Sequence, residues 1–581
     1  MLVLRFLLTA TLLAWLSLSP QAQQTPQAAA SRPEMIAAPD PWWKHAVIYE
    51  IYPRSFQDSN GDGVGDLNGI TSRLDYLEEL GIDAIWITPF YPSPQVDFGY
   101  DISDYEAIDP QYGTVADFDR LLRDAHKRHI RVIMDYVANH TSDQHRWFLE
   151  SRSSRDNPKR DWYIWRDGKG PGQPPNNWQS WFGHSAWTYD GKTAQWYYHY
   201  FYVEQPDLNW RNPEVRKAMY DILRFWLARG AAGFRMDAVS RLFEDPNLHD
   251  DPLLPGINAF GDPNIEHKYT QDLPEVHEVM REMRAVVDSY PEDPVLISEA
   301  DEPTITDLVR QYGTNNDEIQ LPMDFQVADV NRLSAPEFRK LLDEIEFNAL
   351  QGQPYFFFSN HDQSRTWDRY GDGIHNDQIA KLMAALLLTT RATPQMYYGE
   401  ELGMRTTTPT RKEDVKDPVG RTGWPKDKGR DGERTPMQWD SSPNAGFSTA
   451  TKTWLPVPPS ATRYNVALEE RDPDSILNFY KQVIRLRRDQ PALRDGDYVA
   501  VNRDNQNVLA YLRKSRDGKD AVLVALNMSS EPHKVNFQLK GFGVRGSSLR
   551  VLLAAPRPSV SELALTGVEL PPFGVLVAGV N

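Results

Sequence analysis

The chain has 581 residues, enough for three or four domains or for one large barrel with additions, and its 40% apolar and 25% charged residues exclude a disordered or collagen-like protein. Asp and Glu outnumber Lys and Arg by 81 to 63, and the net charge of −18 argues against nucleic acid as a partner. The sequence contains no cysteine, which excludes disulfide frameworks, thiolate metal sites and thiol catalysis.

The N-terminus has the pattern of an export signal. Arg5 precedes the apolar run Phe6–Leu18, and small residues follow up to Ala22. The run is too short to cross a bilayer as a helix of the mature protein. We therefore predict a signal peptide over residues 1–22, with cleavage near Ala22 or within Ala28–Ala30. The mature chain is then secreted or periplasmic and has no integral membrane span; an uncleaved anchor is the alternative.

After Trp42, short apolar runs alternate with helical patterns. This alternation is typical of parallel β/α units. The strand candidates are Val47–Tyr52, Ala84–Ile87, Val132–Val137, Gly233–Asp237, Val295–Glu299, Gln320–Asp324, Tyr355–Ser359 and Gln395–Tyr398. Eight such strands with helices between them predict a closed (β/α)8 barrel.

Two of the intervening helices carry clear boundary signals. The first begins near Thr71 and ends at Gly81, a residue that tolerates the left-handed conformation of a helix end. The second has Asn212 as its N-cap, Pro213 in its first turn and Gly230 at its end. These signals place helices after the first and third strands.

The fold class that we predict is α/β, a TIM barrel over residues 40–496 with a subdomain inserted after the third strand. That insertion, residues 141–208, is rich in Trp, Tyr and Gly, and a second long loop spans about 403–460. Loops of this length above a barrel usually shape a binding site. Alternation in Ala521–Leu526 predicts an all-β sandwich domain over residues 497–581.

Acidic residues stand at the ends of several predicted strands, where a barrel gathers its functional groups. They include Asp135, Asp237, Glu299 and Asp362. Two carboxyl groups on opposite sides of a sugar carbon cleave a glycoside with retention when one attacks and the other protonates the leaving oxygen. Arg235 lies two residues before Asp237, on the same face of the strand, where its charge is expected to keep Asp237 ionised.

Four of these segments, in order, resemble the signature regions of the α-amylase family, glycoside hydrolase family 13. They are Asp135–His140, Gly233–Asp237, Ile297–Ala300 and Phe358–Asp362. A fifth segment, Gln205–Asn209, resembles the motif of the oligo-1,6-glucosidase and α-glucosidase branch. The resemblance extends from about Trp42 to the C-terminus and implies a retaining glycosidase.

The resemblance implies that Asp237 is the nucleophile, Glu299 the general acid/base and Asp362 a stabiliser of the transition state. Asp97 and Arg430 correspond to a pair that closes the pocket and restricts cleavage to chain ends. The substrate-binding residues that it implies are Asp97, Tyr100, His140, Phe182, Phe201, Arg235, His361, Arg430 and Arg434. The usual Phe-Gly-Gly of the family reads Phe182-Gly183-His184 here, so the conformation of that loop is not implied.

An Asp-rich loop after the first strand predicts a metal site. Its oxygen donors alternate along the chain at Asp58, Asn60, Asp62, Val64 (through its carbonyl) and Asp66. Hard cations take such oxygen ligands, and loops of this kind in the resembling branch hold Ca²⁺, or Mg²⁺ in its place, structurally. The twelfth position is Gly69 and not a bidentate Glu, so the loop is not an EF-hand. An Asp- and Gly-rich turn without metal is the alternative, and no organic cofactor is implied.

The residue after the predicted nucleophile is Ala238, which in the resembling enzymes favours α-1,4 linkages over α-1,6. The sequence thus predicts a secreted exo-acting α-glucosidase for maltose and short oligosaccharides, with transfer to a second sugar as an accompanying reaction. One alternative is a maltose isomerase of the trehalose synthase type. Another is an inactive barrel that binds sugar as an accessory subunit. The oligomeric state is not predicted.

Overall fold

The structure is a computed structural model that describes residues 40–349, 351–518, 520–544 and 546–581. The predicted signal peptide, residues 1–22, lies outside the described residues. The fold described below is that of residues 41–581, which form one compact unit. In the described residues, no helix combines the length and the apolar character that crossing a membrane requires.

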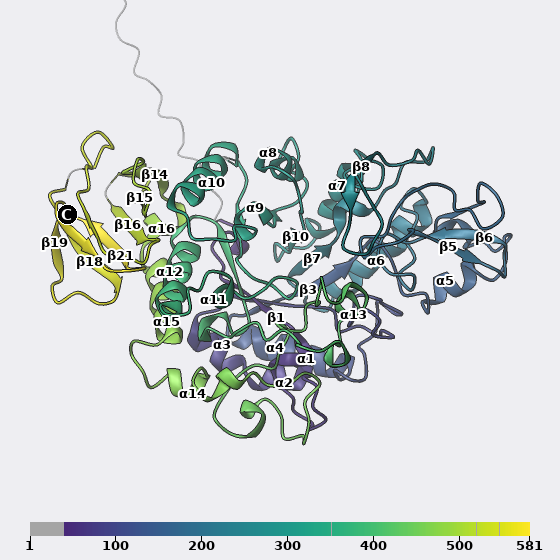
Figure 1. The fold of residues 1–581 in the computed structure, drawn as a ribbon, viewed down its shortest axis with the longest axis horizontal. Helices are drawn as coiled ribbons and strands as arrows, with labels where there is room; N and C mark the ends of the chain where they lie inside the picture. The colour runs from purple at the N-terminus through teal and green to yellow at the C-terminus, as the bar shows by residue number, and fades with distance from the viewer. Residues whose placement is uncertain (1–39, 350, 519, 545) are drawn as a thin grey trace, which may run out of the picture. The chain divides into compact units, whose positions relative to one another are not determined.

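The eight predicted strands form one parallel sheet, which confirms the predicted barrel (Figure 1). The sheet order is β11-β10-β7-β3-β2-β1-β13-β12, and a bridge between Met323 and Tyr355 brings the two end strands together. The strands are β1 (Ile48–Ile51), β2 (Ala84–Ile87), β3 (Arg131–Val137), β7 (Gly233–Asp237), β10 (Val295–Ser298), β11 (Leu321–Pro322), β12 (Tyr355–Phe356) and β13 (Thr393–Tyr397). They are apolar on both faces because helices cover the outside and side chains fill the inside.

Helices follow most of the strands and end where the sequence supplies a cap. The α-helices are α1 (Pro53–Phe56), α2 (Leu67–Ser72), α3 (Leu74–Leu80), α4 (Val115–Lys127), α5 (Arg146–Ser151), α6 (Pro213–Leu227), α7 (Val276–Val287), α8 (Ile305–Leu308), α9 (Phe325–Ala328), α10 (Ala335–Asn348), α11 (Thr366–Arg369), α12 (Asn376–Thr389), α13 (Pro418–Gly423), α14 (Val466–Glu469), α15 (Ile476–Asp489) and α16 (Pro491–Asp495). The 3₁₀ turns are η1 (Trp42–Lys44), η2 (Arg160–Trp162), η3 (Val239–Arg241), η4 (Val309–Tyr312), η5 (Glu400–Leu402), η6 (Lys412–Asp414), η7 (Pro443–Gly446) and η8 (Pro459–Thr462).

The two helices with predicted boundaries are present, with small differences. The first is broken at Arg73 into α2 and α3, and Gly81 ends α3 with a φ of 97°. Asn212 caps α6 by accepting a hydrogen bond from the backbone N–H of Glu214. That helix ends at Leu227, three residues before Gly230.

Two smaller sheets rise from the carboxyl ends of the barrel strands. The insertion after β3 contains the antiparallel strands β4 (Trp165–Arg166), β5 (Trp187–Asp190) and β6 (Gln195–Tyr198) around a small aromatic core. A hairpin of β8 (Leu253–Ile257) and β9 (Pro263–Ile265) follows β7 and η3. Both elements lie on the side of the barrel where the acidic residues end their strands.

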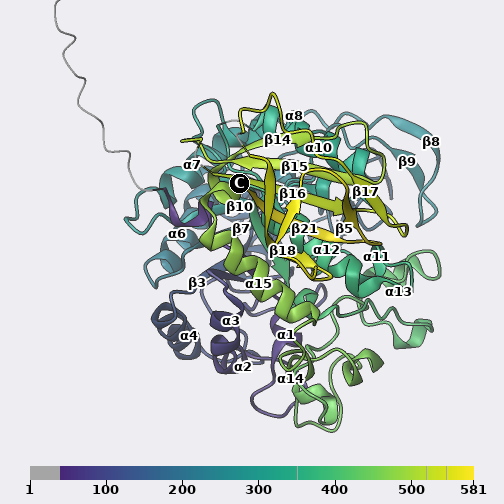
Figure 2. The same ribbon diagram turned by 90° about the vertical axis from the view of Figure 1, so that its left-hand side faces the viewer.

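The C-terminal segment is an antiparallel β domain. One sheet contains β14 (Asp497–Val501), β15 (Val508–Lys514), β16 (Ala521–Asn527), β18 (Ser548–Ala555), β19 (Glu562–Ala564) and β21 (Val575–Val580), and a second contains β17 (His533–Val535) and β20 (Val568–Leu570). Apolar side chains from both sheets share one core. The larger sheet packs against α10, α12 and α15 of the barrel (Figure 2).

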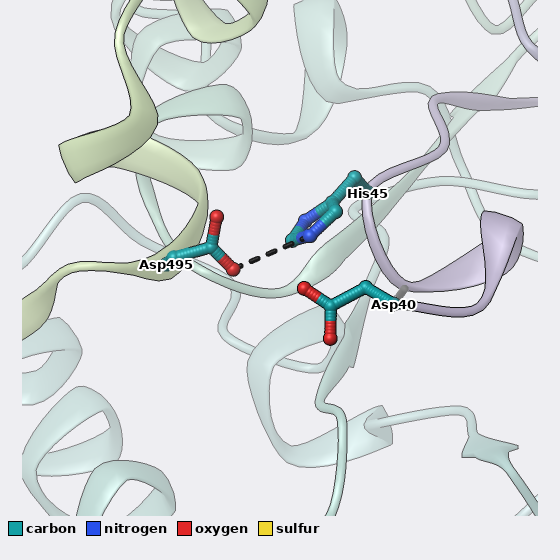
Figure 3. Close-up of side chains that lie close together, drawn as sticks. All are labelled: Asp40, His45 and Asp495. Atoms are coloured by element: carbon teal, nitrogen blue, oxygen red, sulfur yellow. Dashed lines mark ion pairs between the residues drawn. The ribbon is translucent and has the colours of Figure 1, made fainter. Parts of the chain in front are cut away.

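The start of the barrel domain is fastened to the helix that precedes the C-terminal domain. His45 Nε2 lies 3.3 Å from Asp495 Oδ1 at the end of α16 (Figure 3). Lys44 Nζ lies 3.5 Å from the same oxygen. These contacts join the two ends of the barrel segment at the N-terminal side of the strands, away from the predicted catalytic residues.

Candidate active site

The strand register brings two acidic residues to one level and places Asp135 two positions below them. Asp135 on β3 pairs with Arg235 on β7, and Val137 pairs with Asp237. The residue after β10, Glu299, donates its backbone N–H to Met236 O at 3.0 Å. Asp237 and Glu299 therefore end neighbouring parallel strands at the same height, as the sequence predicts for a shared site.

Arg235 connects these acids. Its guanidinium is completely buried, with Nη1 2.7 Å from Asp237 Oδ1, Nη2 2.9 Å from Glu299 Oε1 and Nη1 3.3 Å from Asp135 Oδ1. The other oxygen of Glu299 accepts the backbone N–H of Ala238 at 3.0 Å. One cation thus holds both predicted catalytic carboxyls in a fixed orientation toward the same space.

Opposing effects act on the pKa of Asp237. Burial and the repulsion of Glu299 raise the pKa of Asp237 well above its usual value, and Arg235 opposes them without reversing the shift. Arg235 lies 2.7 Å from Asp237 and acts in the predicted direction, and the ionised state of Asp237 stays a prediction. Arg235 divides its charge among three carboxyls, which repel one another.

The inner end of the site is closed by charge pairs. Arg430 Nη2 donates to Asp97 Oδ1 and Nη1 to Asp362 Oδ1, both at 2.9 Å, while Nε donates to Asp417 Oδ2 at 2.8 Å. Arg434 Nη2 donates to Asp362 Oδ1 at 2.7 Å. Burial alone would raise the pKa of Asp362, but the two guanidinium groups hold it well below its usual range.

Asp97 titrates differently from Asp362. Burial raises its pKa to about 6, although Arg430 lies within hydrogen-bond distance. Gln205 Nε2 donates to Asp97 Oδ2 at 3.3 Å and lies 3.0 Å from His140 Nε2. Asp97, His140 and Arg430 are therefore in one network, as predicted, and Gln205 from the fifth motif joins them.

Tyr100 and His361 form a stacked pair beside this network. Their rings are 5.4 Å apart with an interplanar angle of 9°, and the Tyr100 hydroxyl lies 2.7 Å from His361 Nε2. His361 Nδ1 lies 2.7 Å from Glu50 Oε1, a buried carboxyl on β1. Burial raises the pKa of Glu50 well above its usual value. Tyr100 thus faces the site with an orientation fixed from behind.

The aromatic residues of the insertion also reach the site. The Phe182 and Phe201 rings are 5.7 Å apart, and Phe182 stacks on Tyr202 at 4.2 Å. Gly183 has a φ of 91°, and a Cβ there would come within 2.3 Å of the Phe260 ring. His184 donates its backbone N–H to Asp262 at 2.7 Å. The altered Phe-Gly-His loop is therefore fitted to the β8–β9 hairpin.

These residues surround a cavity of about 630 Å³. The cavity is lined by Asp97, Tyr100, His140, Trp181, Phe182, Tyr200, Phe201, Asp237, Ala238, Ser240, Arg241, Phe260, Glu299, Asp301, Phe325, Asp329, Asp362, Gln363, Val419, Asp427, Gly429, Arg430 and Glu433. Arg235, His361 and Arg434 lie beneath this lining and contact it through Asp237, Tyr100 and Asp362. The structure therefore brings all twelve predicted catalytic and substrate-binding residues together.

Several residues of the site were not predicted. Asp417 and Glu50 hold predicted residues in place, and Trp181, Arg241 and Asp301 line the cavity. Asp301 follows Glu299 by two residues, and Arg241 follows Asp237 by four, so position after a catalytic strand was an available signal. Asp417 lies in the long loop after β13, where the sequence has no periodic pattern.

The predicted metal loop is held by its own backbone. Asp58 Oδ2 accepts the N–H of Gly63 at 2.8 Å, and Asp66 Oδ1 accepts the N–H of Gly69 at 2.7 Å. The three carboxyls of the loop do not form a group whose oxygens all lie within 4.8 Å of one another. The donor chemistry suits a hard cation, and the metal stays a prediction.

Comparison with known proteins places this geometry in context. Residues 50–496 match the family model described as alpha amylase, catalytic domain, and residues 498–577 match the C-terminal domain of maltogenic amylase. A protein of Rhizobium meliloti named "Probable alpha-glucosidase" is 42% identical over 554 residues, which cover 92% of this chain and 97% of that protein.

Two further relatives differ in their named activities. An oligo-1,6-glucosidase of Heyndrickxia coagulans is 41% identical over 523 residues, 84% of this chain and 92% of that protein. The crystal structure of a trehalulose synthase from Pseudomonas mesoacidophila superposes with a TM-score of 0.85 at 38% identity, and the match covers 94% of this chain and all of that one. The same fold at this similarity thus includes enzymes named for hydrolysis and enzymes named for synthesis.

Proposed function

This chain belongs to the α-amylase family of glycoside hydrolases, and we propose that it is an exo-acting α-glucosidase that releases glucose from the ends of maltose and short oligosaccharides. The observation that carries the proposal is the closed inner end of the cavity. Arg430 joins Asp97 to Asp362 behind the catalytic carboxyls. A closed end accepts one terminal sugar and leaves no path for a chain to pass through.

The reaction proceeds by double displacement. Asp237 attacks the anomeric carbon while Glu299 protonates the departing oxygen, and a glycosyl-enzyme forms. Water, activated by Glu299 now acting as base, then releases glucose with retained configuration. Arg235 contacts both carboxyls and favours the charge that develops when Asp237 leaves the sugar. Asp362, kept ionised by Arg430 and Arg434, accepts hydrogen bonds from sugar hydroxyls.

The linkage preference follows from Ala238. Its side chain lines the cavity directly after Asp237, and its φ of 45° is a left-handed conformation that a β-branched residue adopts at a high cost. The small side chain leaves room for the aglycone of an α-1,4 linkage. The proposed order of substrates is therefore maltose before isomaltose, with transfer to a second sugar when acceptors are abundant.

The second candidate function is intramolecular transfer, which turns one disaccharide into an isomer. Its support is the similarity to structures named trehalulose and isomaltulose synthase, at 37 to 38% identity and TM-scores of 0.84 to 0.85. Such an enzyme uses the same two displacements, but the released sugar attacks the glycosyl-enzyme before water does. A catalytically inactive accessory role has less support, because Asp237, Glu299 and Asp362 are all present and line one cavity.

Product analysis separates these functions. The enzyme is incubated with maltose, isomaltose, sucrose and trehalose, and the sugars are resolved by anion-exchange chromatography. Free glucose from maltose as the main product is expected. An isomeric disaccharide as the main product would instead establish the transfer function. The Asp237→Asn variant is expected to lose activity by about 10⁴- to 10⁶-fold, the range seen when one member of a catalytic group is removed, and unchanged turnover would remove Asp237 from the mechanism.

A further inference from the structure

The two ends of the catalytic cavity differ in exposure. At the inner end, the side chains of Asp97 and Arg430 are 8% and 16% exposed. At the other end, Trp181 is 47% exposed and the side chain of Asp301 is 50% exposed. The second group therefore forms an outer end that opens to solvent. Since the inner end receives the terminal sugar, the outer end receives the aglycone, the part of the substrate beyond the cleaved bond.

An aromatic platform forms one side of the outer end. The rings of Trp181 and Tyr200 stack with centroids 6.3 Å apart at 19°. The Arg241 guanidinium lies 5.7 Å from the Trp181 ring and 5.4 Å from the Tyr200 ring. A flat apolar surface with one exposed ring is a suitable contact for the apolar face of a sugar or an aryl group.

Carboxylates dominate the remainder of the outer end. Asp301, Asp329 and Asp427 all line the cavity. Gln363 Nε2 donates to Asp329 Oδ1 at 3.0 Å and fixes that side chain beside the cavity. These carboxylates are separate from the catalytic group, and the mechanism above gives them no task.

The cationic side chain at the outer end, Arg241, already lies close to two carboxylates. Among the described residues that line the outer end, Arg241 is the one with a cationic side chain. Its Nη2 lies 3.7 Å from Asp301 Oδ2, and its Nη1 lies 3.9 Å from Asp272 Oδ2. Arg241 is also 8% exposed as a residue, so an incoming group does not reach it freely. The field that an aglycone meets is therefore negative.

We propose that the outer end is an aglycone subsite for neutral, hydroxyl-rich groups, and that Asp301 and Asp329 make the enzyme reject aglycones that carry an anionic group such as phosphate or carboxylate. The inference rests on the proposed α-glucosidase function and specifies its substrate class. Hydroxyl groups donate hydrogen bonds to the carboxylates. An anion has no donor to offer and meets two like charges in a partly enclosed space.

A matched pair of substrates tests this selection. The compounds are 4-carbamoylphenyl and 4-carboxyphenyl α-D-glucopyranoside, which have aglycones of nearly the same shape, one neutral and one anionic. For the wild type at low ionic strength, we expect kcat/KM to be at least about tenfold higher for the neutral compound, the size of effect given by like charges several Å apart at a protein surface. Salt at 1 M, where the Debye length is about 3 Å, is expected to reduce this ratio several-fold.

Variants assign the effect to the two carboxylates. The difference in leaving group is the same in every variant, so the change in the ratio reports the charge of the subsite. Asp301→Asn with Asp329→Asn is expected to lower the ratio by about tenfold, and each single variant by less. Glu531→Gln, which makes the same charge change at an exposed position of the C-terminal domain, is expected to keep the wild-type ratio. The salt dependence of the wild type needs no variant and covers the case in which the double variant does not fold.

Failure of the inference is distinguishable from failure of the proposed function. Cleavage of both compounds with a ratio that neither salt nor the Asn substitutions change would overturn the subsite proposal and leave the glucosidase intact. Absence of glucose release from maltose and from both aryl glucosides would overturn the proposed function itself. A lowered ratio in Glu531→Gln equal to that in the double variant would show a general charge effect and would also overturn the subsite proposal.

Discussion

At the scale of single residues, one buried guanidinium holds the catalytic carboxyls together. Arg235 presents separate nitrogens to Asp237 and Glu299 and a longer contact to Asp135. Its Cζ lies 5.0 Å from the Trp86 ring, which supports it from below. A planar, two-armed cation suits this task because a point charge cannot contact two carboxyls in fixed directions.

The Arg235→Lys variant tests the importance of that geometry. Lysine keeps the charge but loses the second arm, so Glu299 or Asp237 loses its partner. We expect kcat/KM on maltose to fall by about 100-fold or more, the size seen when one aligned electrostatic contact is removed from an active site. The control is Arg332→Lys, because Arg332 has an 80% exposed side chain. Equal activity of the two variants would show that charge alone is sufficient at position 235.

The ion pair between Asp97 and Arg430 at the inner end of the cavity has a predictable pH dependence. Burial raises the pKa of Asp97 to about 6, so above pH 6 the carboxylate accepts from Arg430 and below pH 6 it becomes neutral like asparagine. The ratio of kcat/KM for the wild type to that for Asp97→Asn is therefore expected to be about tenfold or more at pH 7.5, since hydrogen bonds to charged groups contribute about 1.5 to 3 kcal/mol. It approaches unity as the pH falls to 5. A ratio that is constant from pH 5 to 7.5 contradicts this assignment.

At the scale of elements, the sequence predicted the strands well and the loops poorly. Strands such as Val132–Val137 and Gly233–Asp237 are visible as apolar runs because a parallel barrel buries both faces of each strand. The β8–β9 hairpin was not predicted, since Leu253–Ile257 contains Pro255 and Gly256 and its side chains are exposed. A strand without a buried face leaves no alternation in the sequence.

The same difference between strands and loops explains which residues of the site could be predicted. Residues carried on strand ends, such as Asp237 and Glu299, could be placed in one pocket from the order of the strands alone. Asp417 could not be placed in this way. It contacts Arg430 within the long loop after β13, and the sequence of that loop has no periodic pattern. The repulsion between Asp237 and Glu299 could not be predicted for a related reason, since it depends on a distance that sequence spacing does not give.

The Asp-rich loop is an element whose metal can be tested directly. We propose that Ca²⁺, or Mg²⁺ in its place, is held by the oxygen donors of Asp58, Asn60, Asp62, Val64 and Asp66. A ligand at 100 times its Kd stabilises a folded protein by about 2.7 kcal/mol. Each kcal/mol raises the Tm by roughly 2 to 4 °C in a domain of about 150 to 250 residues, so we expect a shift of several degrees at most in this larger domain.

Chelation of the metal is therefore expected to lower the Tm measured by differential scanning fluorimetry, and added Ca²⁺ to restore it. Asp62→Asn is expected to reduce the response to chelator, because it removes one negative charge from the exposed side of the loop. Asp156→Asn, at an exposed position of the insertion, should respond as the wild type does. A Tm that is independent of chelator and Ca²⁺ in the wild type would favour the turn without metal.

At the scale of the whole molecule, the barrel domain buries several carboxyl groups. Burial raises the pKa of several glutamates other than the predicted catalytic acid. These are Glu244 and Glu401, each raised to about 7, and Glu433 and Glu469, each raised to about 8. Folding therefore takes up protons at neutral pH, and the stability of the whole domain depends on pH.

Glu401 gives the clearest test of this dependence. Its Oε1 accepts from the hydroxyls of Tyr49 at 2.8 Å and Tyr76 at 2.5 Å, so strand β1, helix α3 and turn η5 meet at one carboxyl. The pKa of Glu401 is raised in the folded state to about 7, compared with about 4.3 in an unfolded chain. The contribution of Glu401 to the free energy of unfolding is fully present below about pH 4.3 and is lost as the pH rises through about 7. Each unit of pKa difference corresponds to about 1.4 kcal/mol.

The Glu401→Gln variant removes the titration and keeps an oxygen that accepts from a tyrosine. We expect its Tm to be equal to or below that of the wild type at pH 5 and above it at pH 8, because only the wild type must bury a charge at the higher pH. The Tm of both proteins is measured across pH 5 to 8 by differential scanning calorimetry. Glu344→Gln, a half-exposed glutamate on α10, serves as the control and should follow the wild-type curve. Parallel curves for the wild type and Glu401→Gln would show that Glu401 stays ionised in the folded protein, and that the tyrosine hydroxyls outweigh its burial.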